Sequence, residues 1–431
     1  MKKFLFVWAV LLGVLLLGCS LEPAHQHTFG DWTLKEQATC AKAGIEERIC
    51  AECQTIETRP TEKPAHDLNA YNICKNCRYV SFDPEATVVE LGIFSNYYYV
   101  NNPTANYAWD VKIWGDLVYR GAGDYDKNAG TAPILAFNKA TQSWVQMGIT
   151  DDQAVQRFVE IGGKLYAPGI DANGSWDLGN FYVLEGDTWK QVRNLPNGLH
   201  NFDMVEFDGK IFAGLGTETV GNTVAVSADK GESWTFAPLY QNGKLFDTAG
   251  YEFSRTYAFA RYNNSLYALL MFKKANGYDY CIFRYADGKM EYQSPAGNLT
   301  SRVSWNYWQS VVEWKGVCYL TSSVLNAITD FSDPDSHRQI SMPKDQVVSD
   351  ILLYNDELYV LSFAYDQQAQ SCEVTICKSA TGADGSFTEV VCFDYGAIPL
   401  AFDFDGTHFY IGTGNCPSNQ SRSGMLLRVK A

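Results

Sequence analysis

The sequence predicts an all-β protein built from repeated hairpins, and three observations support this. A segment running from Val159 to Ala167, with apolar residues on both sides of a Gly-Gly pair, occurs in seven variants along the chain. Aromatic residues make up 14% of the chain and glycines number 35, which is typical of strands and tight turns. Helical periodicity is absent throughout. We therefore expect a seven-bladed β-propeller over residues 83–431.

The seven variants share a strand, a two-residue turn and a second strand. Their third member is always Gly, Asn or Asp, residues that tolerate the positive φ of a hairpin turn. The last residues of the variants lie 48, 46, 55, 52, 40 and 50 residues apart, a spacing typical of propeller blades. Six or eight blades are open alternatives, because intervals of 40 and 55 leave room for other boundaries. The segment from Val88 to Phe94 is expected to complete the last blade and close the ring.

A second motif falls between two of the hairpins. Ser227, Asp229, Gly231 and Trp234 fit the pattern Ser-x-Asp-x-Gly-x-x-Trp. This resembles the Asp-box of sialidase-like and kelch-like propellers. The resemblance implies a structural turn in which the carboxylate binds backbone amides and the Trp packs between neighbouring sheets.

The N-terminus is typical of an exported lipoprotein. Lys2 and Lys3 precede 14 apolar residues, too few for a comfortable membrane-spanning helix. The sequence ending in Gly18 and Cys19 resembles the bacterial lipobox, which implies that Cys19 is diacylated. We expect a signal peptide at 1–18, a lipidated tether at 19–24, and an extracytoplasmic protein anchored to the membrane surface of the bacterial cell envelope.

Residues 25–80 form a small cysteine-rich segment. The pairs Cys50-x2-Cys53 and Cys74-x2-Cys77 are separated by 20 residues, the spacing of a zinc ribbon, so we expect these four thiolates to bind a structural Zn²⁺. Disulfides are the alternative. Cys40 with His27 or His66 could complete a second arrangement of metal ligands, and the sequence does not distinguish these alternatives. The segment also resembles cysteine-rich repeats on surface proteins of anaerobic bacteria, which implies a spacer or adhesion module.

The charge of the chain argues against nucleic acid as a partner. The formal charge of −15 becomes −17 once the two lysines of the signal peptide are removed, and there is no basic cluster. A monomer tethered to the membrane is expected.

The candidate binding residues precede the hairpins, where they would meet at one mouth of the central channel. Aromatic faces stack on sugars, and charged groups fix hydroxyls. These ligand-binding candidates are Tyr107, Trp109, Arg157, His200, Asp203, Arg255, Tyr257, Tyr307, Trp308 and Asp350. A further column of residues is expected to face solvent or the channel: Lys112, Glu160, Glu206, Arg261, Glu313, Leu353 and Asp403.

The sequence contains no Gly-x-Ser-x-Gly elbow, phosphate loop or His-Glu-x-x-His motif, and no catalytic residue is assigned. The Asp-box resemblance implies a sialidase-like hydrolase with three arginines, a Tyr–Glu pair and an Asp. However, the Arg-Ile-Pro context of the first arginine is not found: Arg120 lies in Tyr-Arg-Gly, and Ile398-Pro399 follows Ala397. The sequence therefore favours a surface lipoprotein that binds a glycan or a protein without catalysis. The alternatives are a divergent glycoside hydrolase and a structural envelope protein.

Overall fold

The computed structural model describes residues 26–92, 103–123, 130–175, 177–299, 310–321, 323–332 and 337–431. The protein is all-β: these residues form strands and three short 3-10 turns, η2 (Pro103–Asn106), η4 (Gly297–Leu299) and η5 (Gln420–Arg422). None of the helical segments in the described ranges is long or apolar enough to cross a membrane. The predicted signal peptide, the tether and Cys19 lie outside the described residues.

The chain divides into two compact units. The first unit contains the residues up to Asp67 together with Lys75–Cys77, and the second contains Leu68–Cys74 and Arg78–Ala431. The sheet of the first unit is antiparallel, in the order β1 (Thr33–Glu36), β2 (Ile45–Ile49) and β3 (Ile56–Pro60). No residue of these three strands is buried. Its side chains make surface contacts instead, such as Arg48 and Arg59 over the ring of Trp32.

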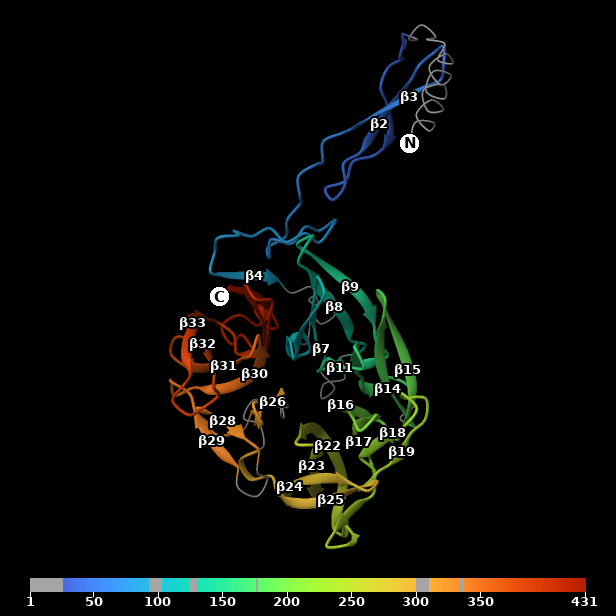
Figure 1. The fold of residues 1–431 in the computed structure, drawn as a ribbon. Coiled ribbons are helices and arrows are strands. Elements are labelled where there is room, and N and C mark those ends of the chain that lie inside the picture. The colour runs from blue at the N-terminus through green and yellow to red at the C-terminus, as the bar shows by residue number, and fades with distance from the viewer. Residues whose placement is uncertain are drawn as a thin grey trace, which may run out of the picture. The chain divides into compact units, whose positions relative to one another are not determined.

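The second unit consists of five four-stranded sheets and one sheet of thirteen strands (Figure 1). The four-stranded sheets are β5 (Val111–Trp114), β6 (Leu117–Arg120), β8 (Pro133–Asn138) and β9 (Ser143–Ile149); β11 (Val159–Ile161), β12 (Lys164–Pro168), β14 (Leu178–Glu185) and β15 (Thr188–Pro196); β26 (Val311–Trp314), β27 (Val317–Leu320), β28 (Ala327–Asp330) and β29 (Arg338–Ser341); β30 (Val347–Tyr354), β31 (Glu357–Asp366), β32 (Ser371–Ser379) and β33 (Thr388–Tyr395); and β34 (Pro399–Phe404), β35 (His408–Thr413), β36 (Leu426–Lys430) and β4 (Val88–Gly92).

The thirteen-stranded sheet contains two further groups of four strands. These are β16 (His200–Phe207), β17 (Lys210–Gly216), β18 (Val224–Ser227) and β19 (Thr235–Phe236), and then β22 (Tyr251–Tyr262), β23 (Ser265–Lys274), β24 (Gly277–Ala286) and β25 (Lys289–Pro295). Five short strands extend it: β7 (Ala122–Gly123), β10 (Asp152–Val155), β13 (Ile170–Ala172), β20 (Leu239–Gln241) and β21 (Lys244–Leu245). Because this sheet joins two groups, the number of blades stays a prediction.

All seven predicted hairpins are present, and each one begins a group of four strands. They are β5–β6, β11–β12, β16–β17, β22–β23, β26–β27, β30–β31 and β34–β35. In the β11–β12 hairpin, Ile161 lies opposite Lys164, and the two residues between them have φ of +56° and +73°. Glycine adopts this left-handed conformation without steric cost, which explains the Gly162-Gly163 pair.

The ends of the second unit meet in one sheet. Strand β4 pairs antiparallel with β36, with Val88 opposite Val429 and Val89 opposite Arg428. This is the closure expected for the segment beginning at Val88. First strands of neighbouring groups also contact one another, in the pairs β11–β16, β16–β22, β22–β26, β26–β30, β30–β34 and β34–β5. The core lies between neighbouring sheets, as in the cluster of Phe402, Phe409 and Leu361 from β34, β35 and β31.

The turn at Ser227–Trp234 is held by hydrogen bonds to Asp229 and by the packing of Trp234. The Asp229 carboxylate accepts hydrogen bonds from the amide of Ser233 at 2.9 Å and from the hydroxyl of Ser227 at 2.7 Å. The ring of Trp234 meets Phe181 of β14 edge-on, with ring centroids 6.0 Å apart, and its indole N–H donates to Asn194 of β15. The turn therefore ties β18–β19 to the preceding sheet, a structural role.

Candidate functional site

The first strands of the groups in the second unit line a central cavity of about 290 Å³. Three of the predicted binding residues lie on its wall: Arg157, Asp203 and Asp350. Six residues of the predicted charged column also line it, namely Lys112, Glu160, Glu206, Arg261, Glu313 and Asp403. The cavity is therefore predominantly acidic.

Four aspartates line this cavity, which we call the channel, and bind backbone amides in a shared pattern. In each carboxylate, Oδ1 accepts from the next residue's amide and Oδ2 accepts from an amide of the following group of strands. The cross-sheet pairs are Asp110 with Phe158 at 2.6 Å, Asp203 with Phe259 at 2.8 Å, Asp350 with Phe402 at 3.0 Å, and Asp403 with Ile113 at 2.8 Å. Because both oxygens are engaged, these carboxylates connect neighbouring sheets in the ring.

Arg157 also has a partner within the channel wall. Its guanidinium lies 2.8 Å from Asp203 Oδ2, and the two side chains are only 12% and 6% exposed. Asp203 thus receives an ion pair as well as the amides of Phe259 and Met204. Two of the predicted ligand-binding residues therefore pair with each other.

Burial shifts the acidity of these channel carboxyls. It raises the pKa of Asp350 to about 8 and that of Asp110 to about 6, and it raises the pKa of Asp203 and Asp403 as well. The ordinary pKa of an aspartate is 3.8. A carboxyl with a raised folded-state pKa stabilises the fold fully below its unfolded pKa, and this stability is lost as pH rises through the folded pKa.

We therefore expect the free energy of unfolding to fall as pH rises from about 4 to about 8. Each group that holds its proton only in the folded state adds a slope of up to about 1.4 kcal/mol per pH unit. Urea unfolding at pH 5 and pH 8.5 measures this, and Asp350→Asn should flatten the upper part of the profile. A stability that rises over this range would mean that the backbone donors outweigh burial and keep the carboxylates ionised.

His200, Arg255 and Tyr257 form a different cluster. His200 stacks on Phe202 at 5.2 Å with the ring planes 10° apart, and Phe202 lies 4.7 Å from Tyr257. The guanidinium of Arg255 lies 5.8 Å from the centre of the Phe202 ring. Burial lowers the pKa of His200 well below its ordinary value and raises the pKa of Tyr257 to about 12. Both side chains are therefore uncharged near neutral pH.

The remaining predicted residues do not join either group. Trp109 is buried, and its indole N–H donates to the carbonyl of Gly123 at 2.7 Å. Tyr107 packs against it with ring centroids 5.3 Å apart. Tyr307 and Trp308 lie outside the described residues. The eight candidates that the structure describes therefore do not lie in one site.

The structure reveals a pocket of about 510 Å³ that the sequence reasoning missed. It lies where the segment after β21 meets the ends of β22, β24 and β25. Its aromatic lining includes Phe246, Tyr251, Tyr278, Tyr280 and Tyr292, and its polar lining includes Gln241, Asp247 and Asp279. The signal was the dense run of aromatic and polar residues from Tyr278 to Tyr280.

The rings and one carboxylate of this aromatic pocket are held in place. Phe246 lies nearly parallel to both Tyr251 and Tyr292, at 21° and 20°, with centroids 6.4 and 6.1 Å apart. Asp279 accepts a hydrogen bond from the Tyr251 hydroxyl at 2.7 Å and pairs with Lys274 at 2.5 Å. The Lys274 ammonium is the main reason that the pKa of Asp279 is lowered, so its carboxylate stays ionised.

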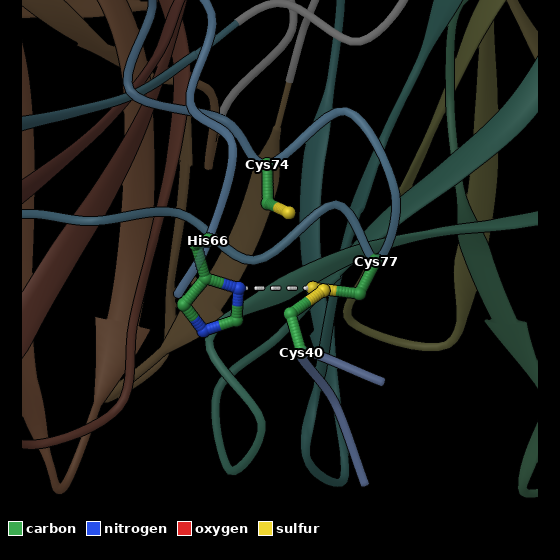
Figure 2. A group of neighbouring side chains, drawn as sticks. All are labelled: Cys40, His66, Cys74 and Cys77. Carbon is green, nitrogen blue, oxygen red and sulfur yellow. Dashed lines mark hydrogen bonds between the residues drawn. The ribbon is translucent and has the colours of Figure 1, made fainter. Parts of the chain in front are cut away.

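Two clusters of cysteine and histidine place possible metal-ligand atoms within 4.8 Å of one another. The first, with four residues, contains Cys40, His66, Cys74 and Cys77. Figure 2 shows their thiols and the imidazole gathered together, with His66 Nδ1 3.3 Å from Cys77 Sγ. Three thiolates and one imidazole are a donor set that structural Zn²⁺ sites use.

The other cluster contains His27, Cys50 and Cys53. The structure therefore corrects the expected ligand set: Cys50 and Cys53 do not gather with Cys74 and Cys77. The reason is the β2–β3 hairpin, whose turn carries Cys50 and Cys53, whereas Cys40 and His66 flank its opposite end. Five residues of extended strand separate the two places by roughly 17 Å.

The comparisons with known proteins concern the fold alone. No family model matches the chain, and no curated protein matches its sequence. The solved structures that it resembles include the β-propeller domain of the Trilobed protease from Pyrococcus furiosus, with 8% identity, 81% of this chain and 87% of that chain covered, and a TM-score of 0.35.

Two other similar structures are named as enzymes acting on glycans. A polysaccharide lyase of family PL25, an ulvan lyase, has 10% identity, covers 74% of this chain and 91% of its own, and has a TM-score of 0.45. The GH93 α-L-arabinofuranosidase of Fusarium graminearum in complex with arabinobiose has 13% identity, covers 71% of this chain and 98% of its own, and has a TM-score of 0.40. Likeness at this level carries no argument about the activity of this chain.

Proposed function

We propose that the protein is a lipoprotein of the bacterial cell surface whose second unit binds a glycan without cleaving it. The observation that carries this proposal is the aromatic pocket around Phe246. Sugar rings stack their C–H faces on aromatic side chains, while carboxylates and amides fix their hydroxyl groups. The pocket offers both kinds of surface, and its volume is in the range of small-molecule sites.

The geometry favours this pocket over the channel. Asp279 is positioned by Tyr251 and Lys274 and stays ionised, so it can accept hydrogen bonds from hydroxyl groups. The channel carboxylates Asp203 and Asp350 already accept hydrogen bonds from the backbone on both oxygens. A ligand in the channel would have to compete with the bonds that join the sheets.

The membrane anchor and the metal complete the proposal. Acylation of Cys19 would hold the protein at the extracytoplasmic membrane surface. Zn²⁺ at Cys40, His66, Cys74 and Cys77 would stabilise the cysteine-rich segment at residues 25–80 as a spacer. The four-ligand cluster supports the metal, and the lipobox resemblance supports the anchor.

A glycan panel tests the proposed function. The full chain, solubilised in detergent, should bind at least one glycan saturably and release no sugar. Tyr251→Ala should weaken that binding about tenfold, because losing a stacked ring costs on the order of 1.4 kcal/mol. Asp279→Asn should also weaken it while keeping the shape of the side chain.

Tyr365→Ala is the matched control, since Tyr365 is an exposed tyrosine outside the pocket. If both pocket variants bound the glycan as tightly as the unaltered protein, the glycan site would lie outside this pocket. Released sugar would favour the alternative, a divergent sialidase-like glycoside hydrolase. No binding to any glycan would favour a protein ligand or a purely structural role in the envelope.

A further inference from the structure

The segment around Cys50 forms a tight knuckle. The amide of Cys50 donates to the carbonyl of Thr55 at 2.9 Å, and the amide of Gln54 donates to the carbonyl of Cys50 at 3.0 Å. Gln54 has φ of +60°, a left-handed conformation that turns the chain after the second cysteine. On the other side, Cys50 forms a β-bridge with Phe29, two residues after His27.

The segment around Cys74 repeats this backbone. The amide of Cys74 donates to the carbonyl of Tyr79 at 2.7 Å, and the amide of Arg78 donates to the carbonyl of Cys74 at 2.8 Å. Arg78 has φ of +62°. Cys74 forms a β-bridge with Leu68, two residues after His66. The chain therefore contains the same knuckle-shaped backbone twice, once around Cys50 and once around Cys74.

The ligand side chains repeat as well. His27 Nδ1 lies 3.1 Å from Cys53 Sγ, and His66 Nδ1 lies 3.3 Å from Cys77 Sγ. The difference between the two arrangements is Cys40, which adds a fourth ligand to the His66 cluster. Among the described residues, the His27 cluster offers three ligand atoms.

We propose that His27, Cys50 and Cys53 form a second Zn²⁺ site with one exchangeable coordination position. Three protein ligands and one exchangeable ligand are the arrangement of reactive zinc sites, whereas four protein ligands close a structural site. His27 and Cys53 are exposed, so an external ligand can reach the metal. This proposal does not depend on glycan binding by the second unit.

The charge of the site selects the class of ligand. Two thiolates balance the double charge of Zn²⁺, and a neutral imidazole adds nothing. A neutral nitrogen donor in the fourth position would leave the site without net charge, and imidazole is a common ligand of Zn²⁺. The exchangeable position should therefore take an imidazole, as carried by a histidine side chain.

Cobalt substitution tests the proposal. The full chain, prepared without a histidine tag and loaded with Co²⁺, should bind two equivalents of metal. Free imidazole should change the visible spectrum of one of the two ions, with saturation. Cys53→Ala should bind one equivalent and lose the response to imidazole. Cys392→Ser, a cysteine in the second unit, should keep both equivalents and the response.

Each other outcome overturns the proposal. One equivalent in the unaltered chain would mean that three ligands do not suffice. Two equivalents without a response to imidazole would mean that the second site is closed. A mass lower by two hydrogens, located to the peptide with Cys50 and Cys53, would show that the pair forms a disulfide instead of binding metal.

Discussion

Removal of the proposed Zn²⁺ from Cys40, His66, Cys74 and Cys77 is expected to unfold the β1–β2–β3 sheet. The strands of this sheet bury no residue, and the buried hydrophobic side chains in the described part of the first unit up to Asp67 are Cys40 and Cys50. The proposed metal ligands therefore take the place of a hydrophobic core in this part of the chain. Metal binding in small zinc modules contributes on the order of 10 kcal/mol, far more than the surface ion pairs of this sheet can replace.

Hydrogen exchange measured by mass spectrometry checks this expectation. Treatment with a strong chelator should abolish protection of the amides in β2 and β3 and leave protection in β31 and β32. The substitution Cys77→Ala, which leaves the His27 cluster unchanged, should lower the protection of the same amides in β2 and β3. Cys392→Ser controls for loss of a cysteine outside the clusters. Continued protection of β2 and β3 without metal would show that the surface contacts of Trp32, Arg48 and Arg59 hold the sheet.

The architecture of the second unit could be predicted because its signal is local and repeated. Turns such as Gly162-Gly163 require positive φ, and the same requirement recurs in every hairpin. The inserted strands β20 and β21 were missed although their turn, Asn242-Gly243, has the same signature, with φ of +52° and +74°. The hairpin was hidden within the longest of the repeat intervals, where it lengthened a spacing that was attributed to one blade.

The candidate sites were harder to predict because they depend on partners far apart in the chain. The spacing of Cys53 and Cys74 favoured a single zinc ribbon. In the structure, each cysteine pair is instead bridged to the segment that follows its own histidine, which gives two clusters. Asp350 was expected to meet a ligand, but its oxygens bind amides of its own strand and of a residue 52 positions away. Sequence alone does not distinguish these two uses of a carboxylate.

The substitution Arg157→Met is expected to destabilise the second unit by about 3–5 kcal/mol at pH 8. It leaves Asp203 buried without its cation, and an unpaired buried charge costs that much. At pH 5 the loss should be smaller, because burial raises the pKa of Asp203 and the carboxyl can take up a proton in place of the lost partner. Urea unfolding at the two pH values measures both effects.

A double-mutant cycle with Asp203→Asn separates this ion pair from the other bonds of Asp203. The coupling between the two substitutions should be favourable by at least about 1 kcal/mol, since the residues are in contact and mostly buried. Glycan binding should stay unchanged in the folded Arg157→Met protein, because the aromatic pocket shares no residue with the channel. If the Arg157→Met protein kept its full stability but lost glycan binding, Arg157 would be a ligand-binding residue, as the sequence predicted. The two measurements together therefore decide whether the charges of the channel hold the ring or recognise a ligand.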